Sequence, residues 1–396
     1  MNHNLYLNMK RQIILFFSLA LIFVACQNND QLQNKINASL LKVKNKFAKD
    51  TRITIHSVSA KIENNSIILF GETEHKDSKK EIINSLKYLN LKIYDSIKFL
   101  PKIENINSIG IIRISVANVR SNPEESAELS TQVLMGMPIV IRKISDDWFY
   151  VQTNEKYLGW LSDDSFVQLS PLALERWNKQ KKFFITSLFE IIREEPNEKS
   201  FPVSDVVAGS IVAIKNYFGK WVFVELPDGR TGYLPINSGK LFDEWKLNTI
   251  ANASSIESVA KSLIGMPYLW GGTSIKGMDC SGFTKTVYML NGIQLSRDAN
   301  QQALEGNEIK TDTNFSQLRK GDLLFFGRKA NKDKPEKIIH VGIYLDSGNV
   351  IHASGLVKIN NLSPQADNYS ERLRKTFICA KRILPEKLNI LEVRKN

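Results

Sequence analysis

The stretch Tyr-Leu-Trp-Gly-Gly-Thr-Ser-Ile-Lys-Gly-Met-Asp-Cys-Ser-Gly-Phe (residues 268–283) places a cysteine at the predicted start of a helix. Between Lys76 and the end of the chain only two histidines occur, His340 and His352, in successive short β-like segments. A thiol needs a neighbouring base to become a nucleophile, and the base needs a partner that fixes its tautomer. Cys280, His340 and His352 therefore predict a cysteine hydrolase.

The segments around this stretch predict an α+β module. Ser254-Ser-Ile-Glu257 has the pattern of a capping box, and the apolar face after it predicts a helix that ends at Gly265. A second helix is expected from Cys280 to Asn291-Gly292. Helices first and an antiparallel-type sheet afterwards is an α+β layout. The expected strands are Asp322–Phe326, His340–Leu345, Val350–Ala353 and Phe377–Leu384.

A cysteine at a helix N-terminus has a favourable electrostatic position. The positive end of the backbone dipole and the unpaired amides lower the cost of a thiolate, which is the reactive form. The same amides, including that of Cys280, can stabilise an oxyanion. Three other interpretations stay open: a small buried cysteine, a disulfide with Cys379, and zinc bound by Cys280 with the two histidines. Structural zinc usually takes close Cys or His pairs, which this chain lacks, so we expect no metal. The predicted hydrolase chemistry also implies no organic cofactor.

The middle of the chain contains a repeat. Trp148-Phe-Tyr-Val, seven residues and Gly159-Trp-Leu match Trp221-Val-Phe-Val, seven residues and Gly232-Tyr-Leu, with an offset of 73 residues. Each copy lies among short strand-like segments separated by Gly, Asn and Asp, which is typical of small barrels. The two copies resemble bacterial SH3-like domains. We expect the barrels at 108–170 and 196–247, joined by a helical linker at 171–195.

The N-terminal part predicts export and a small domain. Met9-Lys-Arg, an apolar run and Val24-Ala-Cys26 resemble a lipoprotein signal (1–26) in which Cys26 accepts a lipid. Residues 27–107 read helix, strand, strand, helix, strand, with strands at Ile53–Ser57 and Ser66–Gly71 and a turn at Asn64-Asn65. This order resembles the BON-type envelope domain. The lipoprotein-type signal predicts an envelope location, at the periplasmic side or the outer membrane.

The charge of the chain excludes few partners. The formal net charge is +12, and the lysines are spread along the whole length. No basic cluster with interleaved aromatic residues stands out, so nucleic acid is not an expected partner. A basic surface suits anionic envelope polymers or lipid headgroups, although solubility alone explains it equally well. We expect a monomer.

The C-terminal module (248–390) resembles the NlpC-type cell-wall cysteine peptidases. The motifs that carry the resemblance are Asp279-Cys-Ser-Gly-Phe, Gly321-Asp-Leu, His340-Val-Gly-Ile-Tyr and Ile351-His-Ala. The resemblance implies a papain-like fold and a triad of a cysteine, a histidine and a third polar residue. It assigns those positions to Cys280, His340 and His352.

Two barrels ahead of such a module resemble the γ-D-glutamyl–diamino acid endopeptidases of murein peptide turnover. The resemblance implies hydrolysis of the amide between γ-D-glutamate and diaminopimelate or lysine, in stems with a free N-terminal L-alanine. Where that group often has serine after an aspartate equivalent to Asp298, this chain has Ala299. A D,L-endopeptidase of intact peptidoglycan and an amidase or acyltransferase of the same fold remain alternatives. The residues expected near the substrate are Tyr268, Asp279, Ser281 and Asp298, with Tyr157 and Glu128 from the first barrel.

Overall fold

The computed structural model describes residues 29–101 and 108–384. The chain forms two compact units, up to Glu104 and from Asn105 onward. No helix among the described residues has the length and apolar character needed to cross a bilayer. The expected signal and its Cys26 lie outside the described residues.

The N-terminal unit has the expected order of helix, strand, strand, helix, strand. A helix over 29–47 packs Ile36 and Val43 against apolar residues of a three-stranded sheet. The turn between the first two strands was predicted correctly, since Asn64 and Asn65 both have positive φ angles, of 47° and 55°. The other elements are β1 (Ser59–Glu63), β2 (Ser66–Thr73), α2 (Lys76–Leu86) and β3 (Lys92–Phe99), with β2 antiparallel to β1 and parallel to β3.

The strand predicted at Ile53–Ser57 is wrong. The first strand of the ladder begins at Ser59, and the preceding residues pair with the end of β2 through a single bridge between His56 and Thr73. The segment 53–57 alternates in polarity as an edge strand does, but the register from the Asn64-Asn65 turn places Ser59 opposite Phe70, near the end of β2. The turn therefore sets where pairing stops.

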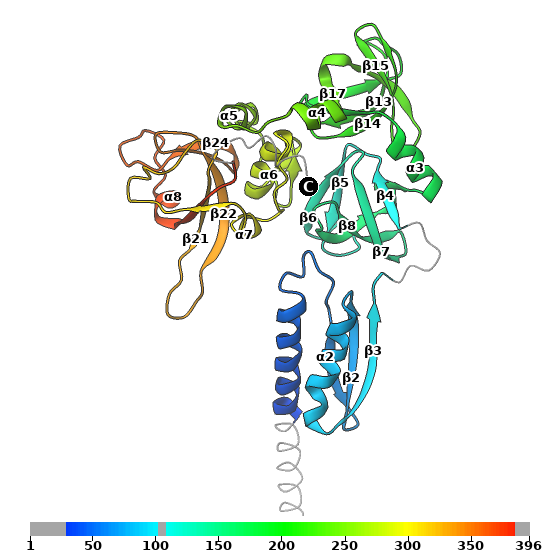
Figure 1. Cartoon of the computed structure of the whole chain (residues 1–396), viewed down its shortest axis with the longest axis vertical. Coiled ribbons are helices and arrows are strands. Elements are labelled where there is room, and N and C mark those ends of the chain that lie inside the picture. The colour runs from blue at the N-terminus through cyan, green and yellow to red at the C-terminus, as the bar shows by residue number, and fades with distance from the viewer. Residues whose placement is uncertain (1–28, 102–107, 385–396) are drawn as a thin grey trace, which may run out of the picture. The chain divides into compact units, whose positions relative to one another are not determined.

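Two seven-stranded sheets open the second unit, and we call them the first and second barrel (Figure 1). The order is β10-β4-β7-β8-β9-β5-β6 in the first and β17-β11-β14-β15-β16-β12-β13 in the second, so the topologies are identical. The first barrel has β4 (Ile109–Ile112), β5 (Val116–Arg120), β6 (Leu129–Leu134), β7 (Pro138–Ser145), β8 (Trp148–Thr153), β9 (Leu158–Ser162) and β10 (Phe166–Gln168). The second has β11 (Lys182–Ile185), β12 (Phe189–Arg193), β13 (Pro202–Val207), β14 (Ile211–Phe218), β15 (Trp221–Glu225), β16 (Thr231–Pro235) and β17 (Gly239–Leu241).

The repeat has a structural cause. Tyr150 pairs with Trp160 in the first barrel, and Phe223 pairs with Tyr233 at the equivalent position of the second. A side chain at Gly159 would lie 2.9 Å from the carbonyl oxygen of Arg120 on β5. At Gly232 it would lie 2.6 Å from the carbonyl oxygen of Arg193 on β12. Each glycine thus allows one strand to cross close over another.

The helical linker predicted at 171–195 is only half correct. Helix α3 (Pro171–Lys179) is capped by Ser170, whose side chain accepts a hydrogen bond from the Ala173 amide. The chain then enters β11 and β12. The apolar residues over 183–192 satisfy helical spacing and two short strands equally well, and pairing with β14 and β13 decides between them.

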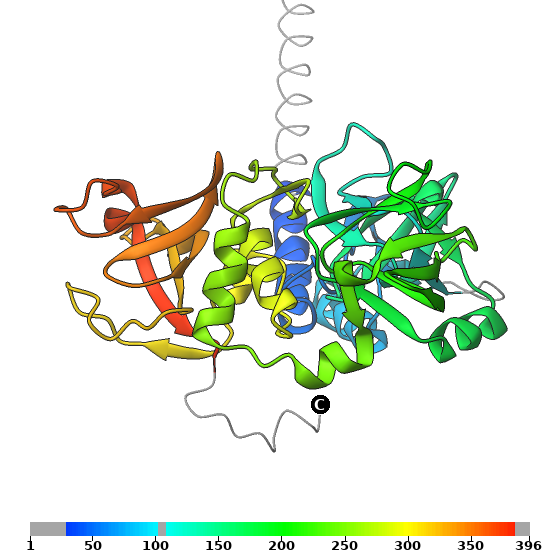
Figure 2. The same cartoon turned by 90° about the horizontal axis from the view of Figure 1, so that it is seen from above.

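The C-terminal module packs helices against one six-stranded antiparallel sheet of order β20-β25-β21-β22-β23-β24. Figures 1 and 2 show α5 and α6 on the same side of this sheet. Phe283 and Val287 of α6 share a core with Ile343 and Ile351 of the sheet. The strands are β20 (Asn307–Ile309), β21 (Leu323–Arg328), β22 (Lys337–Tyr344), β23 (Asn349–Ser354), β24 (Leu356–Asn361) and β25 (Phe377–Arg382). The helices are α5 (Ala253–Ser262), α6 (Cys280–Leu290), α7 (Ala299–Gln302) and α8 (Glu371–Thr376), while α4 (Phe242–Asn248) packs on β11 of the second barrel.

The helix before the cysteine exists, but its cap lies two residues earlier than predicted. Asn252 caps α5, and Asn252 and Ser255 form the reciprocal capping box. Glu257 pairs instead with Lys261 and Lys320. An Asn cap satisfies the first amides as well as a Ser cap does, so the Ser-Ser-Ile-Glu pattern was ambiguous by two positions.

Candidate active site

Cys280 is the first residue of α6, where Asp279 caps the helix by accepting a hydrogen bond of 2.7 Å from the Gly282 amide. The cysteine is only 7% exposed. The backbone amides of Val341 and Ser281 lie near its sulfur and act to lower the pKa of the thiol. Because Val341 directly follows His340 on β22, the start of α6 lies against the part of the strand that carries this histidine.

The two histidines lie together, as the sequence predicted. His340 Nε2 and His352 Nδ1 are 2.9 Å apart, and the rings are nearly perpendicular at 88°. Gly342 on β22 allows this approach, since a side chain there would lie 3.1 Å from His352 Cβ and 2.7 Å from Val350 Cγ1. Gly342, beside His352 on the neighbouring strand, therefore leaves the space that His352 occupies.

A third polar side chain continues this chain, and sequence reasoning missed it. Oδ1 of Asn360 lies 3.0 Å from Nε2 of His352. Asn360 is on β24, a strand that the sequence analysis did not predict. Gly355 followed by the alternating apolar residues Val357 and Ile359 was the available sequence signal for a hairpin there. In the structure Gly355 has a φ of 76°.

Both imidazoles are neutral at physiological pH. Burial, followed by the nearby His352 and Arg372, lowers the pKa of His340 to about 3. Burial also lowers the pKa of His352 to about 4; the hydrogen bond with Asn360 opposes the shift, while Lys358 adds to it. A neutral imidazole has one nitrogen that can accept a proton, which general-base chemistry requires.

The thiol of Cys280 is also neutral at rest, contrary to the expectation from the helix dipole. Burial, followed by the charge of Asp279, raises the pKa of Cys280 to about 11. The amides of Val341 and Ser281 act in the opposite direction but are outweighed. The desolvation of a sulfur that is 7% exposed therefore exceeds the stabilisation from the helix N-terminus. Proton transfer to a base must accompany attack by this thiol.

Tyr268 presents a neutral hydroxyl beside the cysteine. Burial raises the pKa of Tyr268 to about 12, and the charges of Cys280 and Asp279 add to the shift. Its backbone amide donates to the Gly355 carbonyl at 2.9 Å, which ties the segment before the helix to the β23–β24 turn. A phenol that stays protonated is a hydrogen-bond donor suited to a developing oxyanion.

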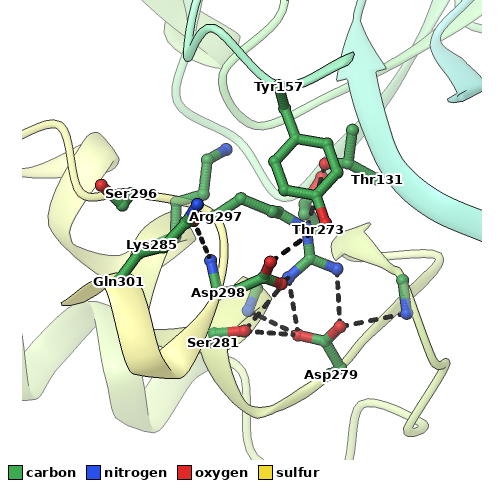
Figure 3. A network of polar contacts seen from close by, with 12 residues as sticks. Thr131, Tyr157, Thr273, Asp279, Ser281, Lys285, Ser296, Arg297, Asp298 and Gln301 are labelled. Atoms are coloured by element: carbon green, nitrogen blue, oxygen red, sulfur yellow. Dashed lines mark hydrogen bonds and ion pairs between the residues drawn. The ribbon is translucent and has the colours of Figure 1, made fainter. Parts of the chain in front are cut away.

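Asp279 has partners that the sequence analysis did not foresee. Arg297 donates to both of its oxygens, from Nη1 at 3.1 Å and from Nη2 at 2.6 Å (Figure 3). The guanidinium is fully buried, and it also donates to Ser281 Oγ at 3.1 Å and Thr131 Oγ1 at 3.0 Å. Asp279 therefore caps α6 and pairs with Arg297, and its expected contact with the substrate stays a prediction. Ser281 belongs to the same buried network.

Asp298 has a different environment. Its side chain is 24% exposed, against 8% for Asp279. Tyr157 of the first barrel donates to its Oδ2 at 3.0 Å (Figure 3). Asp298 also caps the short helix α7 through a capping box with Gln301. Tyr157 and Asp298, which were predicted separately as residues near the substrate, thus lie together at a partly exposed carboxylate.

Glu128 of the first barrel lies beside the segment Trp270-Gly-Gly, which precedes the cysteine. Its Oε1 accepts a hydrogen bond of 2.6 Å from Trp270 Nε1. The next residue of the module, Gly271, approaches the barrel so closely that a side chain would lie 2.1 Å from the Leu129 carbonyl oxygen. Gly271 also donates its amide to Asp279 Oδ2 at 3.0 Å. Glu128 therefore contacts Trp270, and the next residue along the chain, Gly271, contacts Asp279.

The first barrel is held against the module by buried polar contacts. Lys285 of α6 pairs with Glu155 of the barrel at 2.5 Å, and both side chains are at most 6% exposed. Gln132 accepts hydrogen bonds from the Thr273 amide at 2.9 Å and from Ser274 Oγ at 3.1 Å. The barrel residues near the site are thus fixed relative to α6.

The disulfide and zinc alternatives for Cys280 find no support in this geometry. Cys280 and Cys379 are both free, and Cys379 lies on β25 opposite Phe325. Both ring nitrogens of His352 already take part in hydrogen bonds, with His340 and with Asn360. Neither nitrogen of His352 is therefore available to a metal ion without breaking this chain of contacts.

Comparison with protein-family models gives two matches. Residues 265–377 match the model described as the NlpC/P60 family. Residues 119–166, in the first barrel, match the model described as a bacterial dipeptidyl-peptidase Sh3 domain. The second barrel is related to the first by its topology and register.

Known relatives cover most of the second unit. Dipeptidyl-peptidase 6 of Lysinibacillus sphaericus is 31% identical over 281 residues, which cover 67% of this chain and 96% of that protein. A gamma-D-glutamyl-L-lysine dipeptidyl-peptidase of Bacillus cereus is 29% identical over 236 residues, covering 57% of this chain and 67% of the relative. The crystal structure of an NlpC/P60 family protein from Bacillus cereus matches with a TM-score of 0.59 at 24% identity, over 70% of this chain and all of that one, and supports the fold.

Proposed function

Because this chain belongs to the NlpC/P60 family of cysteine peptidases, we propose that it hydrolyses the amide bond between γ-D-glutamate and the diamino acid of short murein peptides. The preferred substrate is a peptide that begins with a free L-alanine, followed by γ-D-glutamate and then diaminopimelate or lysine. Two of its relatives are named for cleavage at γ-D-glutamyl-L-lysine.

Cys280 is the nucleophile in this proposal, and His340 is the base. The sulfur attacks the γ-carbonyl carbon while its proton passes to His340, and Tyr268 and the Cys280 amide stabilise the oxyanion. Collapse breaks the C–N bond, and the leaving amine takes the proton from His340. Water then attacks the thioester, His340 accepts its proton, and the thiol is restored as the dipeptide leaves.

The observation that carries the substrate preference is the hydrogen bond between Tyr157 of the first barrel and Asp298 of the C-terminal module. An ammonium group requires a carboxylate that it can reach, and Asp298 is partly exposed. Asp279 is the less accessible of the two carboxylates, because it is buried and lies 2.6 Å from Arg297, whereas the same guanidinium is 3.9 Å from Asp298. Asp298 thus supplies the more accessible negative charge for a terminal ammonium.

The first barrel makes this recognition selective for a free N-terminus. Tyr157 is only 7% exposed, and it stands over Asp298 as part of a barrel that buried contacts hold in place. A stem whose alanine is linked to a sugar has an amide in place of the ammonium. It loses the charge that pairs with Asp298, and it adds bulk at the position that the barrel occupies.

The test compares three substrates under one set of conditions: the free tripeptide L-Ala-γ-D-Glu-L-Lys, its N-acetylated form, and whole murein. Mass spectrometry detects the products. The proposal expects cleavage of the free tripeptide to L-Ala-D-Glu and lysine, and little cleavage of the other two. Release of peptides from whole murein at a comparable rate would identify a D,L-endopeptidase instead. Cys280→Ala is the inactive control.

We also propose that the protein acts as a monomer in the cell envelope, attached by a lipid on Cys26. The support is the sequence pattern Val24-Ala-Cys26 after a basic start and an apolar run. Metabolic labelling with an alkyne fatty acid tests the anchor. The wild-type chain should incorporate the label and Cys26→Ser should not, and equal labelling of both would remove this assignment.

A further inference from the structure

We propose that Asn360 is a positioning residue that fixes the tautomers of both histidines and thereby keeps a lone pair on Nδ1 of His340. The inference rests on the proposed function in one respect, that Cys280 and His340 are the reacting pair. Asn360 does not touch the substrate in this scheme. It acts through His352.

The orientation of the Asn360 amide follows from its second partner. Asn360 Nδ2 donates to the backbone carbonyl of Asn368 at 3.1 Å. A carbonyl oxygen only accepts, so the NH₂ group must face Asn368, and the oxygen of the amide must face His352. The Asn368 carbonyl is itself held in place, because it also accepts a hydrogen bond of 2.9 Å from the Asn361 amide.

The proton positions on the two rings then follow in sequence. Oδ1 of Asn360 accepts, so Nε2 of His352, 3.0 Å away, must carry the proton. A neutral imidazole with a proton on Nε2 has a lone pair on Nδ1. Nδ1 of His352 therefore accepts from Nε2 of His340 at 2.9 Å. His340 is left with its lone pair on Nδ1, the nitrogen that remains to take the proton of a thiol.

The strand pairing explains why these two side chains meet. His352 on β23 is opposite Lys358 on β24, and Val350 is opposite Asn360. Asn360 is thus two residues along β24 from the partner of His352, on the same face of the sheet, and diagonal neighbours of this kind are within reach of polar side chains. His352 is 3% exposed, so water does not easily replace the amide oxygen.

Without the amide oxygen, His352 is free to carry its proton on either nitrogen. In the molecules with the proton on Nδ1, His352 can no longer accept from His340. His340 then has no partner that holds its proton on Nε2. The tautomer with the proton on Nδ1 becomes populated and presents an N–H group to the thiol, and this form cannot act as a base.

The first measurement uses histidine-labelled protein without substrate. Long-range proton–nitrogen NMR spectra distinguish protonation at Nε2 from protonation at Nδ1. We expect both histidines to carry the proton on Nε2 in the wild type and in Asn360→Asp, which retains an acceptor. In Asn360→Leu we expect a mixture. Protonation of His352 at Nδ1 in the wild type, or unchanged tautomers in Asn360→Leu, would overturn the inference.

The second measurement is cleavage of the free tripeptide. Asn360→Leu should lower kcat by about tenfold, the factor that corresponds to one hydrogen bond of ordinary strength, with KM within about twofold of the wild-type value. Asn360→Asp should recover most of the loss. Asn307→Leu is the matched control, because it makes the same change at an exposed position of the edge strand β20, and it should match the wild type.

The two proposals fail in different ways. Wild-type protein that does not cleave the tripeptide would refute the proposed function, while the tautomer spectra would still decide the role of Asn360. Active wild-type protein with an unchanged kcat in Asn360→Leu would refute the role of Asn360 alone. Backbone amide signals of the second unit at wild-type positions show that a variant is folded, since the histidines outside the site all precede Lys76 and belong to the first unit.

Discussion

The hydroxyl of Tyr157 donates a hydrogen bond to Asp298 over a separation of 141 residues, and this contact joins the first barrel to the module that carries Cys280. On the module side, Arg297 reaches back to Thr131 of the same barrel. Two adjacent residues, Arg297 and Asp298, therefore form separate contacts with the barrel. One is buried and neutralised by Asp279, and the other is partly exposed.

Tyr157→Phe should weaken the binding of free-amine peptides without slowing the chemistry. The variant keeps the ring and removes only the hydroxyl that orients Asp298. A hydrogen bond to a charged group contributes about 1.5–3 kcal/mol, so KM for the free tripeptide should rise by roughly tenfold or more. Steady-state kinetics should show kcat within about twofold of the wild-type value.

Tyr217→Phe is the control for this variant, since Tyr217 is an exposed tyrosine of the second barrel. It should leave both kinetic constants unchanged. A fall in kcat with constant KM for Tyr157→Phe would mean that the hydroxyl acts in the transition state and not in binding of the amine.

Lys285→Met should destabilise the protein strongly, because it leaves Glu155 buried without its cation. Removal of one partner from a buried pair typically costs about 3–5 kcal/mol. The double variant Lys285→Met with Glu155→Leu should recover most of that loss. Urea unfolding followed by tryptophan fluorescence measures the free energies.

Lys179→Met is the exposed counterpart. Its partner Glu175 lies four residues away on α3, and both side chains are more than half exposed. Exposed pairs contribute at most about 1 kcal/mol, so this variant should resemble the wild type. Equal unfolding free energies for Lys285→Met and Lys179→Met would show that the Lys285–Glu155 contact does not hold the barrel to the module.

The sequence was sufficient where a local pattern has one structural solution. Asn64-Asn65 predicted its turn, and the two copies of Trp, seven residues and Gly predicted two equivalent barrels. It was insufficient where two solutions fit the same pattern. The segment 183–192 matched a helix as well as two strands, and only its pairing partners in the second barrel separate the two.

The residues of the candidate site also divide into those that the sequence could predict and those that it could not. Cys280, His340 and His352 were recognisable because few residue types perform their chemistry and the chain has few of them. Asn360 and Arg297 were not, because Asn and Arg are common and their roles depend on contacts with distant residues. The expectation of a stabilised thiolate failed for a related reason. A helix N-terminus is visible in sequence, whereas the burial that raises the pKa of Cys280 is a property of the packed structure.

His352→Asn should retain more activity than His352→Leu. His352 accepts from His340, and an asparagine oxygen can accept as well, whereas leucine leaves the N–H of His340 without a partner. The difference in kcat should be roughly tenfold, as for one hydrogen bond. Kinetics with the free tripeptide measure it, and equal kcat values would show that His352 does not orient His340.

The activity should extend to unusually acidic pH. The pKa of His340 is lowered to about 3 and that of His352 to about 4, so both imidazoles stay neutral well below the ordinary histidine value of about 6.5. For the free tripeptide, kcat/KM should therefore stay constant from pH 7 down to about 5. It should fall above about pH 8, where the α-amine of the substrate loses the proton that Asp298 recognises.

The lowered pKa values of His340 and His352 also predict that the folded protein loses stability as the pH falls. The unfolded histidines bind protons below about pH 6.5, but the native ones do not until about pH 4 or below, so the unfolded state gains protons first as the pH falls. The stability that neutral His340 and His352 contribute is present above pH 6.5 and is lost progressively towards pH 3. Rates must thus be compared with fluorescence-detected folding at each pH. An acid limb of kcat/KM near 6.5 in protein that is still folded would contradict the neutral thiol–imidazole pair and favour a charged one.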